Sequence, residues 1–308
     1  MLVERVPMAQ DEITPTEARR LYVGTSHDRV RGNFADTIVQ SQNHEGRVWM
    51  THQLTYFEVP MKTVCIVFVV LSVALASLAQ AAVKNVVLVH GAFADGSGWK
   101  PVADILERDG YSVYIVQEPE TTFDANIAAT RAVLDRSGPC VLVGHSYGGM
   151  IISEVGNHPS VRSLVYVAAF EPEVGETAGE LQNKIPPASK SVVPAGNGFV
   201  QVKPEAFAED FAADLPKSLA HFMSISQVPI SVAIFDANVT MAAWSQKLSY
   251  AVIARQDRMI NPELERFMSM RARSDSIELP GSHAIFLSHP KEVAALIEKA
   301  ARAGSGGT

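Results

Sequence analysis

Residues 140–148, Cys-Val-Leu-Val-Gly-His-Ser-Tyr-Gly, decide the fold of this chain. The apolar run from Cys140 to Val143 is typical of a buried strand, and the pattern from Gly148 to Asn157 predicts an amphipathic helix directly after it. Ser146 therefore lies in a Gly-x-Ser-x-Gly motif at a sharp strand-to-helix turn, where glycine tolerates the crowding. Because such a turn lifts the serine hydroxyl above the edge of a sheet, Ser146 is a candidate nucleophile.

From Val83 onward, short β-branched runs alternate with helical patterns, which predicts βαβ units and a mostly parallel sheet flanked by helices. We expect strands at Asn85 to Val89, Ser112 to Val116, Cys140 to Gly144, Ser163 to Ala168, Leu248 to Ala254 and Asp275 to Leu279. We expect helices at Trp99 to Arg108, Phe123 to Asp135, Gly148 to Asn157, Pro262 to Arg271 and Pro290 to Ala300. The stretch from about 171 to 247 breaks the alternation and is too long for a loop, so it predicts an inserted helical cap, with helices near Pro204 to Asp214 and Pro216 to Gln227.

A serine nucleophile needs a base, and the base needs an orienting acid. His283 follows the last expected strand, where a loop at the carboxyl end of the sheet brings it over Ser146, so it is the expected base. The histidines that we expect to be structural are His90, His145, His158, His221 and His289. Asp257, in the loop after the fifth expected strand, is the expected acid. Glu171 is the alternative acid, and Asp236 is a more distant one.

The charge that develops on a substrate carbonyl oxygen needs two backbone N–H donors. We expect one from Tyr147, which follows the nucleophile, and one from Ala92, in the His-Gly loop after the first strand. Phe93 and Trp99 in that loop either wall the substrate entrance or fill the core. Phe222 and Trp244 in the cap are candidate substrate contacts, although most of the apolar cap residues could instead pack the cap onto the core. The wider set of such cap residues is Phe199, Phe207, Phe211, Phe222, Met223, Met241 and Trp244.

The N-terminal part follows a different pattern. Residues 61–81, MKTVCIVFVVLSVALASLAQA, have the basic start, apolar run and small-residue end of a secretory signal peptide. We expect Met61 to be the true initiator, residues 1–60 to be a non-native or disordered extension, and 304–308 to be a flexible tail. The mature domain would then span 82–303 and be secreted or periplasmic. The alternative is a cytoplasmic tail followed by a short membrane anchor.

Composition narrows the class of partner. The 308 residues carry a formal charge of −7 without charged blocks, which does not indicate a nucleic-acid surface or a polybasic membrane patch. The two cysteines, Cys65 and Cys140, cannot form the dense disulfide framework of a small secreted domain, and Cys140 is expected to be a small buried side chain. We therefore expect a small-molecule substrate, with no nucleic acid and no membrane once the signal peptide is removed. The oligomeric state stays open.

Four segments together resemble the α/β-hydrolase superfamily: the His90-Gly91 loop, the turn at Ser146, Gln256-Asp257-Arg258 and Gly281-Ser282-His283. The chain is most similar to its compact branch of plant methyl-ester hydrolases and hydroxynitrile lyases, because the His-Gly loop follows the first strand. The resemblance covers Val83 to about Ala300. It implies a six-stranded core, a helical cap, no cofactor and the triad Ser146, Asp257 and His283.

The expected function is hydrolysis of a small hydrophobic ester through an acyl-enzyme. The hydroxynitrile lyases of the branch carry Thr where this chain has Gly91 and Lys where it has Ala284, so both lyase marks are absent. The esterases often have Met at the second of these positions, and Ala284 departs from that pattern. A lyase, a lactone or amide hydrolase, and a non-catalytic binding protein on the same fold are the alternatives.

Overall fold

The computed structural model describes residues 83–305. The expected extension at 1–60, the expected signal peptide at 61–81 and Cys65 lie outside the described residues, as do the last three residues of the chain. Within 83–305, no helix is both long enough and apolar enough to cross a membrane.

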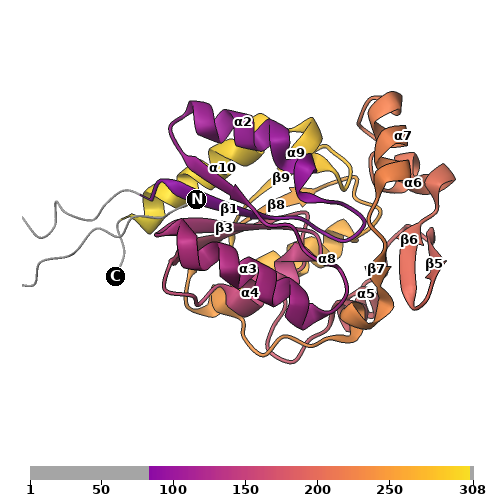
Figure 1. The fold of residues 1–308 in the computed structure, drawn as a ribbon, viewed down its shortest axis with the longest axis horizontal. Coiled ribbons are helices and arrows are strands. Elements are labelled where there is room, and N and C mark those ends of the chain that lie inside the picture. The colour runs from indigo at the N-terminus through magenta and orange to yellow at the C-terminus, as the bar shows by residue number, and fades with distance from the viewer. Residues whose placement is uncertain (1–82, 306–308) are drawn as a thin grey trace, which may run out of the picture. The chain divides into compact units, whose positions relative to one another are not determined.

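A six-stranded sheet forms the centre of the domain, with the strand order β2-β1-β3-β4-β8-β9 (Figure 1). All of its neighbouring strands pair in parallel. Its strands are β1 (Asn85–Val89), β2 (Ser112–Ile115), β3 (Cys140–His145), β4 (Val161–Val167), β8 (Leu248–Ala254) and β9 (Asp275–Leu279). The expected fold class and the expected strands are confirmed, with end points that differ by one or two residues.

The position of β1 explains where a site can form. The chain adds β2 on one side of β1 and then crosses to add β3 on the other side, so the strand order reverses between β1 and β3. In parallel sheets of this kind, ligands bind beyond the carboxyl ends of the strands at such a reversal. The register pairs Val89 with Gly144, which sets the loop after β1 beside the turn after β3.

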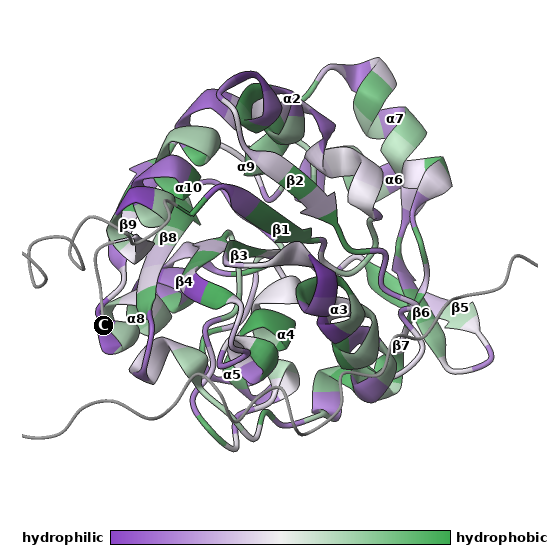
Figure 2. Cartoon of the chain, turned by 60° about the vertical axis from the view of Figure 1, so that its left-hand side comes forward, coloured by the Kyte–Doolittle hydropathy of each residue, from purple (hydrophilic) through white to green (hydrophobic). Residues whose placement is uncertain are grey.

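Helices cover both faces of the sheet (Figure 1). One apolar core lies on the face covered by α2 (Lys100–Arg108), α9 (Ile285–Ser288) and α10 (Pro290–Gly304). The other core lies on the face covered by α3 (Phe123–Ser137), α4 (Gly148–Val155) and α8 (Pro262–Ala272). Figure 2 shows β1 as hydrophobic along most of its length, and β1, β3 and β4 are almost entirely buried, as expected for strands covered on both faces. Cys140 is a free, fully buried cysteine, in agreement with the sequence-based expectation.

The cap differs from the prediction, because it is not purely helical. It contains α5 (Ala178–Lys184), α6 (Pro204–Asp210), α7 (Lys217–Ser226) and the 3₁₀ helices η3 (Val232–Asp236) and η4 (Ala243–Ser245). It also contains an antiparallel sheet of β5 (Val192–Gly196), β6 (Phe199–Val202) and β7 (Ile230–Ser231). The turn between β5 and β6 is Asn197-Gly198, and both residues have positive φ angles, 52° and 78°. Asn-Gly favours such hairpin turns, so this part of the sheet could have been predicted.

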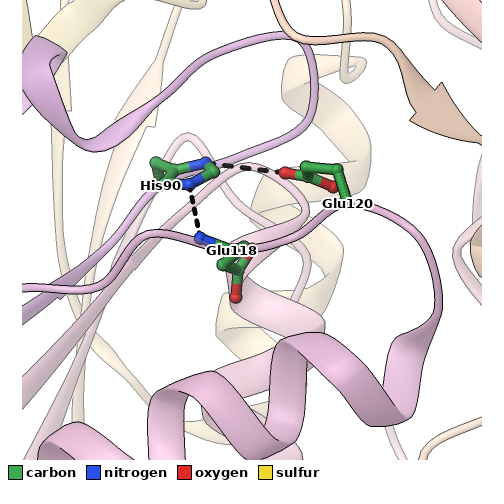
Figure 3. Close-up of side chains that lie close together, drawn as sticks. All are labelled: His90, Glu118 and Glu120. Atoms are coloured by element: carbon green, nitrogen blue, oxygen red, sulfur yellow. Dashed lines mark hydrogen bonds and ion pairs between the residues drawn. The ribbon is translucent and has the colours of Figure 1, made fainter.

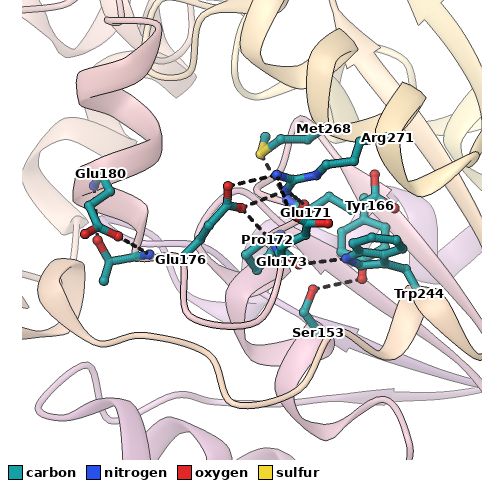
Figure 4. A network of polar contacts seen from close by, with 11 residues as sticks. Ser153, Tyr166, Glu171, Pro172, Glu173, Glu176, Glu180, Trp244, Met268 and Arg271 are labelled. Carbon is teal, nitrogen blue, oxygen red and sulfur yellow. Dashed lines mark hydrogen bonds and ion pairs between the residues drawn. The ribbon is translucent and has the colours of Figure 1, made fainter.

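A buried polar network joins the end of β4 to the cap and to α8 (Figure 4). Glu171, which is almost fully buried, accepts a hydrogen bond from Ser274 Oγ at 2.5 Å. Its backbone carbonyl accepts from Arg271, and Arg271 also pairs with Glu176 at 2.7 Å. Burial raises the pKa of Glu171 to about 8, against the opposing effects of Ser274 and Arg271. The side chain is therefore neutral in the folded protein at pH 7.

This neutral carboxyl predicts a pH-dependent stability. The unfolded chain releases the Glu171 proton near the usual pKa of 4.5, whereas the folded chain keeps it up to about pH 8. The contribution of Glu171 to stability is therefore greatest below pH 4.5 and is lost as the pH rises to about 8. Glu171→Gln should gain stability relative to the wild type between pH 5 and pH 8, by a few kcal/mol at about 1.4 kcal/mol per pKa unit.

Urea unfolding at pH 5 and at pH 8 measures this difference. Glu173→Gln is the matched control, because Glu173 lies near the same Arg271 but its side chain is 54% exposed. An equal difference between Glu171→Gln and wild type at both pH values would contradict a neutral Glu171.

Candidate active site

The backbone at Ser146 is held in an uncommon conformation. Its φ angle is 52°, in the left-handed region that side chains other than glycine rarely adopt. Three backbone hydrogen bonds hold it there: Ser146 N–H donates to Val167 at 3.2 Å, and the Ser146 carbonyl accepts from Gly149 at 3.0 Å and from Phe170 at 3.1 Å. Strand β4 and helix α4 therefore fix the turn from both sides.

Glycines around this turn are required by close packing. A Cβ at Gly144 would lie 2.6 Å from the carbonyl oxygen of Gly148, and a Cβ at Gly148 would lie 2.6 Å from that of His90. At Gly149 the corresponding distance to the Phe170 carbonyl oxygen is only 1.9 Å. The sequence motif is thus explained by backbone segments that approach one another too closely for any side chain.

The structure brings Ser146, His283 and Asp257 together in one chain of hydrogen bonds. Ser146 Oγ lies 2.8 Å from His283 Nε2, and His283 Nδ1 lies 2.5 Å from Asp257 Oδ2. All three side chains are buried, and His283 is only 1% exposed. The carboxylate accepts the Nδ1 proton, so Nε2 is free to accept the serine proton. This is the arrangement that activates a serine for nucleophilic attack.

Backbone N–H groups also donate hydrogen bonds to the carboxylate of Asp257. Its Oδ1 accepts backbone N–H groups of Met259 at 2.7 Å and of Ile260 at 2.9 Å. Glu265, on α8, is also buried, and its Oε2 accepts the N–H of Ala254 at the end of β8. Burial and the neighbouring Asp257 charge raise the pKa of Glu265 well above its usual value. A neutral carboxyl therefore lies next to Asp257, a feature that the sequence did not reveal because the residues of α8 show only a helical pattern.

The two alternative acids lie elsewhere. Glu171 bonds Ser274 rather than a histidine, and Asp236 is exposed at the end of η3 in the cap. Within the described residues, Asp257 is the only carboxylate that contacts His283.

One expected oxyanion donor, Tyr147, directly follows Ser146, and the other, Ala92, lies in the loop after β1 that packs against Ser146. Within residues 83–305, the backbone N–H groups of Ala92 and Tyr147 have no protein acceptor. A Cβ at Gly91, just before Ala92, would lie 2.6 Å from Ser146 Cβ, so this loop packs directly against Ser146. Two free N–H groups beside a serine hydroxyl are suited to stabilise negative charge on a substrate oxygen.

His90 shapes the same loop. Its Nε2 accepts the backbone N–H of Glu118 at 3.0 Å, and its Nδ1 lies 3.1 Å from the Gly91 carbonyl and 3.5 Å from Glu120 Oε1 (Figure 3). The imidazole thus connects the chain after β2 to the loop after β1. The pKa of His90 is lowered by burial, so the ring is neutral.

His90, Glu118 and Glu120 place possible metal-ligating atoms within 4.8 Å of one another. The donor set does not fit a metal, because Nε2 already accepts a proton donor and Nδ1 therefore carries the ring proton, which is directed at carbonyl and carboxyl oxygens. Burial raises the pKa of Glu118 well above its usual value and that of Glu120 to about 8. The two acids are therefore neutral at pH 7.

The remaining histidines do not contact Ser146 Oγ. His145 Nε2 donates to the backbone carbonyl of His283 at 3.0 Å, and the two rings pack with centroids 4.7 Å apart. Burial and the neighbouring His283 lower the pKa of His145 well below its usual value, which keeps it neutral. His158 pairs with Asp135 at 3.2 Å near the surface. His221 lies on α7, and His289 precedes α10.

A mostly apolar cleft lies between cap helix α7 and the loop after β1. Phe93 and Phe222 line it, together with Leu219, Met223, Phe286 and Leu287 and the polar residues Asp95, Ser97, Ser226 and Gln227. Ser146, His283 and Asp257 are not among the residues that line it. The other two candidate substrate contacts lie elsewhere. Trp99 is fully buried with its ring 4.7 Å from Phe286, and Trp244 donates its Nε1–H to Pro172 at 2.7 Å. Trp99 therefore fills the core, and Trp244 secures the start of the cap.

Known proteins resemble this chain in sequence and in fold. It is 34% identical over 119 residues to a carbendazim hydrolyzing esterase of Nocardioides sp., which covers 33% of this chain and 49%, about half, of that esterase. It is 26% identical over 247 residues to a pyrethroid hydrolase of Sphingobium wenxiniae, which covers 70% of this chain and 86% of that protein. The crystal structure of a pyrethroid hydrolase from Sphingobium faniae matches with a TM-score of 0.63 at 24% identity, over 71% of this chain and 97% of that chain.

The model of the alpha/beta hydrolase family matches residues 86–296, which include the sheet, the cap and every residue of the site described above. The resemblance inferred from the sequence motifs is confirmed. The chain belongs to the alpha/beta hydrolase family.

Proposed function

We propose that this chain is a serine carboxylesterase that hydrolyses a small hydrophobic ester through an acyl-enzyme. The observation that carries the proposal is the buried chain of hydrogen bonds from Ser146 through His283 to Asp257. No cofactor takes part in this proposed reaction.

In the first half of the proposed reaction, Ser146 Oγ attacks the ester carbonyl carbon while its proton passes to His283 Nε2. Asp257 holds the imidazole in the tautomer that can accept this proton and stabilises the imidazolium that forms. The N–H groups of Ala92 and Tyr147 stabilise the charge on the former carbonyl oxygen. His283 then protonates the leaving alcohol, and the acyl group stays on Ser146.

In the second half, water attacks the acyl-enzyme. His283 takes a proton from the water, and the same N–H groups stabilise the second tetrahedral intermediate. Its collapse releases the carboxylic acid and returns the proton to Ser146. The loop that carries Ala92 thus serves both halves of the cycle.

The loop after β1 does not favour the lyase alternative. A Cβ at position 91 would lie 2.6 Å from Ser146 Cβ and 2.9 Å from the His145 carbonyl oxygen. The Thr of the hydroxynitrile lyases would therefore require this loop to move away from the nucleophile. Ala284, at the other lyase position, is fully buried, so a Lys there would also need a different packing.

The cleft between α7 and the loop after β1 supports an apolar substrate group. Its aromatic and aliphatic lining is suited to hydrophobic acyl or alcohol parts. The relatives named for pyrethroid and carbendazim hydrolysis support the same broad class. Action outside the cytoplasm remains a further proposal, which rests on the sequence of residues 61–81.

Ser146→Ala tests the nucleophile. Turnover of p-nitrophenyl esters should fall to a residual rate on the order of 10³ to 10⁴ over water, because only the oxyanion donors and substrate binding remain. An organophosphonate should label the wild type at Ser146, as read by peptide mass spectrometry, and should leave the variant unlabelled. Labelling of a different residue in the wild type would reject the assignment.

Asp257→Asn compared with Glu171→Gln tests the acid. The first change should lower kcat by up to about 10⁴-fold, because an amide facing Nδ1 favours the wrong histidine tautomer. Glu171→Gln should leave kcat within about twofold of wild type, since Glu171 contacts no histidine. The reverse ranking in steady-state kinetics would move the acid to the end of β4.

Phe222→Ala tests the apolar cleft. Its ring lines the cleft although it is 59% exposed, so its loss should lower kcat/KM for hexanoate and octanoate esters by roughly fourfold to tenfold and spare acetate. Ile225→Ala is the control, because Ile225 lies on the same helix, is 64% exposed and does not line the cleft. Equal losses for all chain lengths, or the same pattern in the control, would show that the cleft does not bind the substrate chain.

A further inference from the structure

The end of cap helix α6 touches both loops that carry the proposed acid and base. The backbone carbonyl of Phe211, which follows the helix, accepts from the backbone N–H of Ala284 at 3.0 Å. Ser282 Oγ lies 3.2 Å from the same carbonyl but donates its single proton in a shorter hydrogen bond to the carboxylate of Asp214, also in the cap. Ser282 and Ala284 flank His283, so two cap residues hold the histidine loop on both sides of the base.

The side chain of Phe211 packs directly against the imidazole of His283. It is fully buried, and its ring packs edge-on against the His283 ring with centroids 4.8 Å apart and planes at 82°. Phe207, one helical turn earlier, stacks on Phe211 with centroids 4.7 Å apart. The His145 ring, with its centroid 4.7 Å from that of His283, packs against the imidazole on an adjacent side, since the Phe211 and His145 centroids are only 6.2 Å apart.

The preceding residue, Asp210, holds the loop of the acid. Asp210 is 5% exposed, and its Oδ1 accepts from Arg258 Nε at 2.8 Å. Arg258 follows Asp257 directly in the chain. The second carboxylate oxygen of Asp210 accepts from Ser189 Oγ at 2.7 Å, and the Ser189 N–H donates to the Arg258 carbonyl at 2.8 Å. Arg258 is thus held at its side chain and at its backbone.

We propose that Asp210 and Phe211 are positioning residues of the cap, which set the distances from Asp257 to His283 and from His283 to Ser146. The proposal rests on the proposed function, because it concerns the same three side chains. The acid and base loops come from the ends of β8 and β9, and the nucleophile comes from the end of β3. Because the cap holds the loops of Asp257 and His283 in place, activation of Ser146 depends on how the cap packs against these loops.

Asp210→Asn is the test, with Glu209→Gln as the matched control. Glu209 is the neighbouring acid on α6 and contacts the same Arg258 at 3.3 Å, but its side chain is 74% exposed. Asp210→Asn should lower kcat for p-nitrophenyl acetate about tenfold while KM changes less than about twofold, since small misplacements of reacting groups act on the chemical step. The control should keep wild-type kcat and KM.

A small organophosphonate gives a second readout that does not depend on the apolar cleft. Its second-order rate of reaction with Ser146 should fall in Asp210→Asn by the same factor as kcat. Arg258→Gln should reproduce both losses, and the double variant should add no further loss, because the two side chains act as one pair. Since the Arg258 side chain is 40% exposed, this variant also carries the test if Asp210→Asn fails to fold.

Three results would overturn the proposal: wild-type kcat and phosphonylation in both variants, a rise in KM alone, or a lower melting temperature with unchanged kcat. The Ser146→Ala variant, run in parallel, separates these from a failure of the proposed function. If Ser146→Ala keeps turnover, the proposed esterase mechanism is wrong. If Ser146→Ala is inactive and Asp210→Asn is fully active, only the positioning role is wrong.

Discussion

The left-handed backbone of Ser146 is the constraint on which the rest of this structure depends. A residue other than glycine held at such an angle costs about 1–3 kcal/mol, so the surroundings must over-determine it. Here β4 supplies an acceptor for the Ser146 N–H, and the segments at Gly149 and Phe170 supply donors for its carbonyl. The same requirement makes the neighbouring glycines necessary, since backbone passes within contact distance of each. These hydrogen bonds hold the strained backbone conformation of Ser146, and this conformation directs its Oγ at His283.

Around this rigid turn, the other groups of the site come from separate loops that need support. His90 provides some of it, because its ring connects the chain after β2 to the loop after β1. His145 provides more, since its ring packs on His283 and donates to its carbonyl. The cap segment at Asp210 and Phe211 adds contacts to the loops after β8 and β9. The cap thus contacts the loops that carry Asp257 and His283, in addition to forming one side of the cleft.

Several buried carboxyl groups are neutral in this fold. Burial is the largest cause in each case, and it raises the pKa of Glu118, Glu120, Glu171 and Glu265. A neutral carboxyl can lie in a core at a much lower cost than a charged one, which is why these groups do not require an ion-pair partner. The carboxyl of Asp257 has a different environment, since two backbone N–H groups and His283 contact its oxygens.

The sequence by itself determined the parallel sheet, the strand-turn-helix at Ser146 and the order of the three groups proposed for the triad. These features are local, because a β-branched run, a helical period and the glycines of a tight turn each lie within a few neighbouring residues of the sequence. Asn197-Gly198 is an equally local hairpin signal for the pairing of β5 with β6, whereas the pairing of β6 with β7 joins residues far apart in the chain. The sequence favoured Asp257 over Glu171 as the partner of His283, and the tertiary structure shows that contact. The tertiary structure alone decided that Trp99 fills the core and that Asp210 and Phe211 reach the loops of Asp257 and His283. Those contacts join residues many positions apart in the chain, and their distances depend on how the cap packs on the sheet, which no local pattern encodes.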